Sequence, residues 1–192
     1  MDDMIAEGDK VAIRSPFHGD PEFETIFILR IKDGKITDRW GYTDHDQKFA
    51  EANKAVARRW VEEIWNKGDL SVIDEIVAED YVDRSPAAPG APTDRDGIKA
   101  GVSGFRAAFP DAHFAIDAMM AEGDTVVVPQ TFTGTHQGEL HGAPATGNQV
   151  TFKGIFIYRI QNGKIVERWG AFDTLSFMIQ LGAVPPPGEG GK

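Results

Sequence analysis

The sequence contains no cysteine, and this absence excludes disulfide bonds, thiolate zinc ligands and thiol nucleophiles. It also has no apolar run near the roughly 18 residues that a membrane-spanning helix needs. Basic residues are scarce: 20 Lys and Arg stand against 30 Asp and Glu, which gives a net charge of −10. Since no basic cluster offsets this charge, neither nucleic acid nor an anionic membrane is an expected partner.

The length and the apolar content indicate a folded protein of modest size. With 192 residues, of which 41% are hydrophobic, the chain can form one domain, or one domain and a fragment. The first residues, MDDMIAEGD, lack the basic and apolar regions of a signal peptide. We therefore expect a cytoplasmic protein.

A long segment of the sequence occurs twice. Residues 3–19 match residues 118–134, and FETIFILRIKDGKITDRWGYTD, residues 23–44, matches FKGIFIYRIQNGKIVERWGAFD, residues 152–173. A match of this length indicates an internal duplication. Each copy is predicted to form a three-stranded meander, with Asp33-Gly34 and Asn162-Gly163 as tight hairpin turns.

Residues between the two copies have the spacing of helices. Apolar side chains recur at helical spacing from Phe49 to Trp65, and Gly68 is placed to end this helix. Further helices are predicted over 70–77 and 93–109, with a short strand at 81–85 between them. The fold class is therefore α+β, with helices packed on a strongly curved antiparallel sheet that encloses a cone-shaped pocket.

This pattern predicts three segments. Residues 46–184 are expected to form the complete domain, residues 1–45 a partial duplicate made only of strands, and residues 185–192 a flexible tail. An isolated meander exposes an apolar face and two edges. Either the chain is part of a longer tandem protein, or the extra strands pack on the back of the main sheet. The second arrangement would be an intrachain pseudo-dimer, in place of a homodimer through the same face.

Several motifs occur in a fixed order: WNKGDLSVIDEIVAEDYVDRSP, AEGDTVVV, GTHQGELHGAPATG, YRIQNGKIVERW and QLG. Over residues 56–184 they resemble the SnoaL-like polyketide cyclase, or ester cyclase, family of the NTF2-like superfamily. The resemblance implies a cone fold and cofactor-free acid/base chemistry, such as aldol-type cyclisation or isomerisation, on a small apolar carbonyl compound. The alternative is a non-catalytic small-molecule-binding or association module, because the same fold hosts both.

The resemblance places the catalytic acid/base at Asp173. Strand alternation puts Glu167, Trp169 and Asp173 on one face, which we expect to be the pocket floor. In a purely structural interpretation, Asp173 caps the helix that follows it. Asp44, its counterpart in the first copy, is expected to be a helix cap.

Other site candidates surround the predicted pocket. His136 is either a second catalytic group or a loop histidine bonded to the backbone. Glu167 shares the pocket or forms a structural ion pair with Arg84 or Arg168. The substrate-binding candidates are aromatic or charged: Trp169, Tyr158, Arg84, Glu167, Phe105 and Phe109.

Two further expectations concern metals and departures from the family pattern. His136, Glu139 and His141 match no standard ligand spacing, so no metal site is predicted. Arg84 stands where many family members carry histidine. Pro129 stands where many carry arginine, and a proline there predicts an edge or a bulge in its strand.

Overall fold

The computed structural model describes residues 3–17, 20–86, 90–140 and 142–185. The chain divides into two compact units, Met1–Glu51 and Ala52–Lys192, and the division falls within helix α1 (Asp44–Arg59). The sequence-based boundary at residue 45 lies at the first turn of the same helix. Most of the expected flexible tail, from residue 186 onward, lies outside the described residues.

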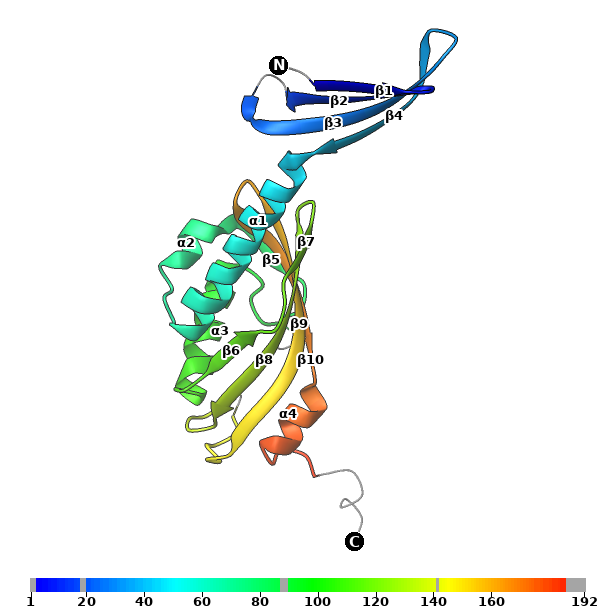
Figure 1. Cartoon of the computed structure of the whole chain (residues 1–192). Coiled ribbons are helices and arrows are strands. Elements are labelled where there is room, and N and C mark those ends of the chain that lie inside the picture. The colour runs from blue at the N-terminus through cyan, green and yellow to red at the C-terminus, as the bar shows by residue number, and fades with distance from the viewer. Residues whose placement is uncertain (1–2, 18–19, 87–89, 141, 186–192) are drawn as a thin grey trace. The chain divides into compact units, whose positions relative to one another are not determined.

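Unit 1 contains a four-stranded antiparallel sheet in the order β1-β2-β3-β4 (Figure 1). Its strands are β1 (Asp3–Glu7), β2 (Lys10–Phe17), β3 (Asp20–Lys32) and β4 (Lys35–Thr43). The sequence predicted three strands, so β1 is an addition. Gly8 has a φ of 60°, and this conformation, which glycine adopts easily, closes the tight turn through which β1 pairs with β2.

Unit 2 combines a bent sheet with a layer of helices. Helix α1 continues into the π-helical η1 (Trp60–Asn66), followed by α2 (Val72–Ile76), α3 (Arg95–Ala108) and α4 (Thr174–Gln180). The strands are β5 (Val77–Asp83), β6 (His113–Ile116), β7 (Met120–Glu122), β8 (Thr125–Thr135), β9 (Gln149–Gln161) and β10 (Lys164–Phe172). Their order is β5-β10-β9-β8-β6, with β7 also on β8; β5 runs parallel to β10, and the other pairs are antiparallel.

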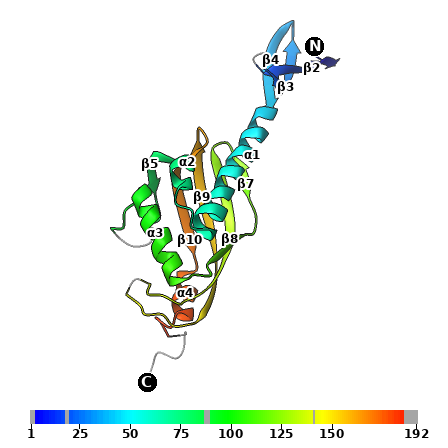
Figure 2. The same cartoon turned by 90° about the vertical axis from the view of Figure 1, so that its left-hand side faces the viewer.

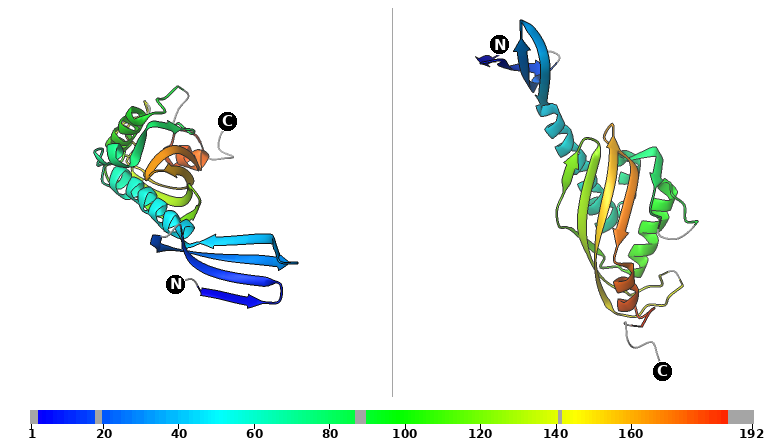
Figure 3. Two further views of the ribbon diagram at one scale, coloured as in Figure 1. Left: turned by 90° about the horizontal axis from the view of Figure 1, so that it is seen from above. Right: turned by 90° about the vertical axis from the view of Figure 1, so that its right-hand side faces the viewer.

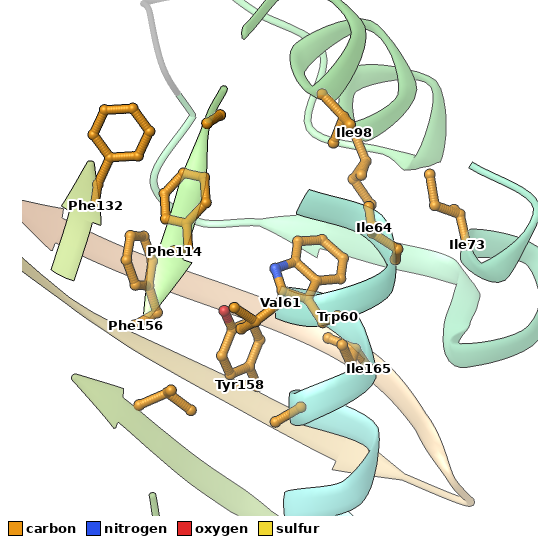
Figure 4. Close-up of a cluster of buried hydrophobic side chains, with 14 of the residues drawn as sticks. Trp60, Val61, Ile64, Ile73, Ile98, Phe114, Phe132, Phe156, Tyr158 and Ile165 are labelled. Atoms are coloured by element: carbon orange, nitrogen blue, oxygen red, sulfur yellow. The ribbon is translucent and has the colours of Figure 1, made fainter. Parts of the chain in front are cut away.

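The helices of unit 2 cover one face of its sheet. Figure 2 shows the helices in front of the strands, and the right panel of Figure 3 shows the strands from the other side. The core lies between these layers, where Trp60 and Ile64 are almost fully buried against the sheet (Figure 4). The predicted α+β cone is therefore confirmed. Among the described residues, no helix has the length and apolar character required to cross a membrane.

Pro129 lies where β8 changes its neighbour. Thr125–Val127 pair with β7, whereas Gln130–Thr133 pair with β6. Pro129 falls between these two stretches, and its missing N–H therefore removes no register pair on that side of β8. On its other side Pro129 pairs with Ile155 of β9 without a register shift, so β8 has no bulge there and resembles an edge only between its β7 and β6 pairings.

A β-bulge sets the direction of the side chains on β10. Ile165 pairs with Ile160 and Glu167 pairs with the next residue, Arg159, so Val166 is an extra residue on β10. An extra residue shifts the alternation by one position. Ile165 points into the core, and Arg168 lines the inner side instead of Glu167. The prediction that Glu167 and Trp169, which follow the bulge, face the pocket was therefore wrong.

Unit 1 repeats this geometry. Thr37 is the extra residue of the β3–β4 pair, at the position equivalent to Val166. Ile31 N donates to Asp9 O at 2.7 Å, as Ile160 N donates to Asp124 O at 2.7 Å in unit 2. These shared local structures support the internal duplication inferred from the sequence.

Candidate functional site

Unit 2 contains a cavity of about 490 Å³ between its helices and the inner face of its sheet. Apolar side chains from η1, α3, the strands and α4 form most of the wall. They include Trp60, Trp65, Phe105, Phe114, Phe152, Phe156, Phe172, Phe177 and Met178. A concave, mainly apolar pocket of this size is typical of small-molecule sites.

One sheltered ion pair lines this cavity. Asp83 ends β5, and the parallel register with β10 places it beside Arg168. Arg168 Nη1 donates to Asp83 Oδ2 at 2.7 Å, and the two side chains are only 15% and 17% exposed. Asp83 Oδ1 accepts from the backbone N–H of Ser85 at 2.9 Å. Both oxygens of the carboxylate are therefore held in a fixed orientation at the wall.

Two neutral polar groups lie on the same side of the cavity. Gln130 Nε2 donates to the hydroxyl of Tyr158 at 3.4 Å, and both side chains are buried. Burial raises the pKa of Tyr158 to about 12, although the nearby Arg168 charge opposes this shift. The phenol therefore keeps its proton at neutral pH and can donate it in a hydrogen bond.

Tyr81 lies close behind this group, buried against Trp60. Burial raises the pKa of Tyr81 well above its ordinary value, again opposed by Arg168. Its hydroxyl has no hydrogen-bond partner among the described residues. A buried polar atom without a partner is costly, and Tyr81 is not part of the cavity lining.

Arg168 is held over an aromatic ring. Its Cζ lies 5.0 Å from the centroid of Phe156, within cation–π distance. Gly170 leaves space for this ring, because a Cβ there would lie 2.7 Å from Phe156 Cδ1. Burial is the largest single influence on the pKa of Arg168 and lowers it, but Asp83, Tyr158 and Tyr81 together raise this pKa above its ordinary value, so the guanidinium stays cationic.

Asp173 does not line this cavity. It is the N-cap of α4, its carboxylate accepts from Ser176 N at 2.9 Å, and the residue is exposed. Its neighbours Phe172 and Thr174 do line the cavity, which places Asp173 near the rim. The structure thus shows the helix cap, and the acid/base role of Asp173 stays a prediction.

His136 lies in the protein interior and is also not part of the cavity wall. Its ring is fully buried, 5.2 Å from the ring of Phe109, and its Nδ1 contacts Thr146 Oγ1 at 3.1 Å. Its Nε2 has no partner among the described residues. Phe109 is likewise a core side chain, whereas Phe105 and Tyr158 line the cavity, and their role in substrate binding stays a prediction.

The remaining candidates lie outside the cavity lining. Glu167 accepts from Arg84 Nε at 2.9 Å and also pairs with Arg159. The hydrogen bond from Arg84, assisted by the charge of Arg159, lowers the pKa of Glu167. The structural ion pair expected for Glu167 and Arg84 is therefore present. Trp169 is half-buried and does not reach the cavity.

No group of three or more metal-ligand side chains occurs within the described residues, and His141 lies outside them.

Six polar residues of the cavity lining were not predicted as site residues from the sequence: Asp83, Ser85, Asp94, Gln130, Arg168 and Thr174. Alternation along the strand at Tyr81 puts Tyr81 and Asp83 on the same face, a signal that was present in the sequence. Arg168 has a second signal, since the equivalent position of the first copy is also an arginine, Arg39. The bulge concealed its direction.

Comparison with known proteins identifies the family of this chain. The family model of the SnoaL-like polyketide cyclase matches residues 55–181. The chain belongs to the SnoaL-like polyketide cyclase family. A search of curated proteins gave no significant match. Every motif that carried the resemblance begins within the matched region. The residues that line the cavity of this SnoaL-like chain also lie within it.

Solved structures with a similar fold cover about 70% of this chain. A proposed polyketide cyclase from Bacillus cereus ATCC 10987 is 30% identical over 72% of this chain and 85% of its own, with a TM-score of 0.63. A proposed polyketide cyclase from Acidithiobacillus ferrooxidans is 31% identical over 69% and 95%, with a TM-score of 0.61. AclR, a proposed hydroxylase from Streptomyces galilaeus, is 32% identical over 71% and 84%, with a TM-score of 0.62.

Proposed function

We propose that unit 2 is a cyclase-type enzyme. It carries out cofactor-free acid/base chemistry, an aldol-type cyclisation or an isomerisation, on a small apolar carbonyl compound in the cavity. The observation that carries this proposal is Asp83, a sheltered carboxylate that lines a mainly apolar pocket. Family membership supports the reaction class, while the relative named as a hydroxylase keeps the substrate open.

In the proposed reaction Asp83 is the general base. One carboxylate oxygen takes a proton from the carbon next to a carbonyl group, and the electrons of that C–H bond form an enolate. In a cyclisation, the enolate carbon attacks a second carbonyl carbon of the same molecule, and the oxygen of that carbonyl receives the proton back from Asp83. In an isomerisation, the proton returns to a different carbon. No atom is gained or lost in either case.

The test compares two aspartates. Any compound that co-purifies with the protein is identified by mass spectrometry, and its turnover is measured with the Asp83→Asn and Asp173→Asn variants. We expect Asp83→Asn to lose at least about 100-fold in rate, as removal of a general base does. Asp173→Asn should keep its rate, because asparagine caps a helix as well as aspartate. Normal turnover by Asp83→Asn would refute the assignment, and a loss confined to Asp173→Asn would make Asp173 the base.

A non-catalytic binding module is the second candidate. It is favoured by the position of Asp173, which caps α4 and leaves the cavity without a carboxylate from the end of β10. A protein of this kind would bind the same class of compound and release it unchanged. Recovery of the bound compound without conversion, in wild type and in both variants, would support it.

We also propose that the face of the unit 2 sheet opposite its helices binds either a second copy of the chain or unit 1. Ile155 is 53% exposed on β9, and Ile157 and Trp169 are half-buried on paired positions of β9 and β10. Exposed apolar patches of this kind mark association surfaces. The mass of wild type and of Ile155→Lys in solution tests the homodimer, which requires the variant to dissociate. An unchanged dimer mass would refute this surface.

A further inference from the structure

We infer that the inner face of the unit 1 sheet, defined as the face that carries Phe27, Leu29 and Arg39, is an interaction surface for another polypeptide. The partner that fits this face is an amphipathic helical segment followed by a strand that ends on a carboxylate. Residues 60–83 of this chain have this chemistry, and they pack on the corresponding face of unit 2. The inference concerns unit 1 alone and does not depend on an activity of unit 2.

The inner faces of the two sheets have corresponding positions but differ in burial. Six apolar positions of unit 2 are at most 8% exposed, whereas none of their counterparts in unit 1 is buried, and Ile36 is 62% exposed there. Exposed apolar patches of this kind mark interaction surfaces. The same strand pairings relate Val11, Ile13, Phe27, Leu29, Ile31 and Ile36 of unit 1 to Val126, Val128, Phe156, Tyr158, Ile160 and Ile165 of unit 2.

Unit 2 shows what kind of element covers such a face. Trp60 of η1 packs on Tyr158, with ring centroids 5.8 Å apart, and Figure 4 shows Trp60 beside Tyr158 and Ile165. The helix presents apolar side chains at helical spacing to the strands. At the position of Tyr158 unit 1 has Leu29, which offers an apolar contact without a hydroxyl group. An amphipathic helix with a large apolar side chain therefore fits the unit 1 face.

The edge of the unit 1 sheet offers a place for an added strand. β4 pairs with β3, and among the described strands it has no neighbour on its other side. The corresponding strand of unit 2, β10, pairs on that side with β5 in parallel. An edge strand presents unpaired N–H and C=O groups, and addition of a strand to such an edge is a common mode of protein recognition.

The charge on the face indicates what the added strand carries. The Cζ of Arg39 lies 4.1 Å from the ring centroid of Phe27, and Arg39 makes no ion pair within the described residues. In unit 2, Asp83 at the end of β5 supplies the carboxylate for Arg168. A covered arginine needs such a partner, because an unpaired buried charge is costly. A strand that ends on a carboxylate therefore complements Arg39.

The same charge argues against a second copy of the chain as the occupant. Two inner faces of unit 1 stacked on each other would cover both Arg39 side chains, and the six apolar residues around each of them supply no carboxylate. The helices of a second copy are already in use, because they form the core of that copy's unit 2. The occupant is thus a separate polypeptide with the chemistry of residues 60–83.

A binding experiment on the full chain tests the face. The probe is residues 52–117 of this chain fused to a soluble carrier protein, and its binding is measured by titration calorimetry. We expect one probe to bind per chain, and the carrier alone not to bind. Ile36→Asp in the full chain should weaken binding at least tenfold. The matched control is Ile28→Asp, which changes a 41% exposed isoleucine on the other face of β3 and should alter binding less than twofold.

A charge exchange tests the ion pair. Arg39→Glu in the full chain should weaken binding of the probe at least fivefold, because two carboxylates then meet. Asp83→Arg in the probe should restore most of this loss. If binding is not restored, the carboxylate of the partner strand does not lie beside Arg39, and that part of the inference is refuted.

Three results would overturn the inference as a whole: a folded probe that does not bind, equal losses from Ile36→Asp and Ile28→Asp, or self-association of the chain that Ile36→Asp abolishes. The last result would make a second copy the occupant. If the probe does not fold by itself, the same residues are joined ahead of residue 1 of the full chain. Hydrogen exchange of the β4 amides should then slow at least tenfold, and unchanged exchange would refute the surface. None of these measurements needs turnover, so their outcome is separate from that of the proposed function.

Discussion

The ion pair between Asp83 and Arg168 is expected to stabilise unit 2 far more than a surface ion pair does. The pair is 2.7 Å long, and its side chains are 15% and 17% exposed. At an effective dielectric constant of about 20, two unit charges about 4 Å apart attract by about 4 kcal/mol. Desolvation offsets part of this attraction. We therefore expect a coupling energy of about 2–3 kcal/mol, and a loss of about 3 kcal/mol for Arg168→Met or Asp83→Asn alone.

A double-mutant cycle measures this coupling directly. Wild type, the two single variants and the double variant are unfolded in urea at pH 7 in a Trp40→Phe background, so that fluorescence reports only the tryptophans of unit 2. The chain offers a matched control in Arg58 and Glu62, which are 3.4 Å apart and 54% and 50% exposed. An exposed pair with i,i+4 spacing should couple by only about 0.3–0.5 kcal/mol. A coupling at Asp83 and Arg168 no larger than in this control would refute the reasoning.

Three further predictions concern other parts of unit 2. Gly170→Ala should lower stability by about 1–2 kcal/mol in thermal unfolding, because its Cβ would overlap the Phe156 ring. Gly101→Ala on α3 should raise stability by about 1 kcal/mol, because no atom lies within 4 Å of the added Cβ. Equal effects of the two substitutions would contradict this prediction. Asp173→Ala should cost about 1 kcal/mol and Asp173→Asn almost nothing, since only alanine removes the α4 cap, and equal losses would argue against the cap. Glu167→Gln should destabilise the protein at neutral pH. Because the pKa of Glu167 is lowered in the folded state, the difference from wild type should shrink as pH falls through that pKa, and a pH-independent difference would rule out this origin.

The fold could be predicted from the sequence to a large extent because its signals are local. The turns at Asp33-Gly34 and Asn162-Gly163 have the positive φ values that their residue types favour, and both close hairpins as predicted. The helical spacing between Phe49 and Trp65 and the predicted stop at Gly68 also agree with the structure. The sequence did not reveal β1, because an acidic five-residue strand has little apolar alternation and gains its stability from pairing with β2.

The candidate site could be predicted only in part, because one residue changes the face of a strand. Period-two alternation from Ile165 puts Glu167 and Trp169 inward, and the bulge at Val166 reverses this for the residues that follow. A bulge depends on the pairing of two strands, which periodicity within one strand does not report. The aromatic lining was easier to predict, since Tyr158 and Phe105 lie on elements without such a shift.

Each unit has an arginine at the same position of its sheet, and comparing the two arginines shows which partner only Arg168 has. Arg39 of unit 1 lies over Phe27, with its Cζ 4.1 Å from the ring centroid, as Arg168 lies over Phe156 in unit 2. The corresponding strands of both units therefore form the same bulge and the same cation–π contact. Asp83, the carboxylate that orients Arg168, comes from β5, and β5 belongs to the segment that has no duplicate. The sheet of unit 2 supplies the guanidinium, and β5 supplies the carboxylate that forms a sheltered ion pair with it at the wall of the cavity.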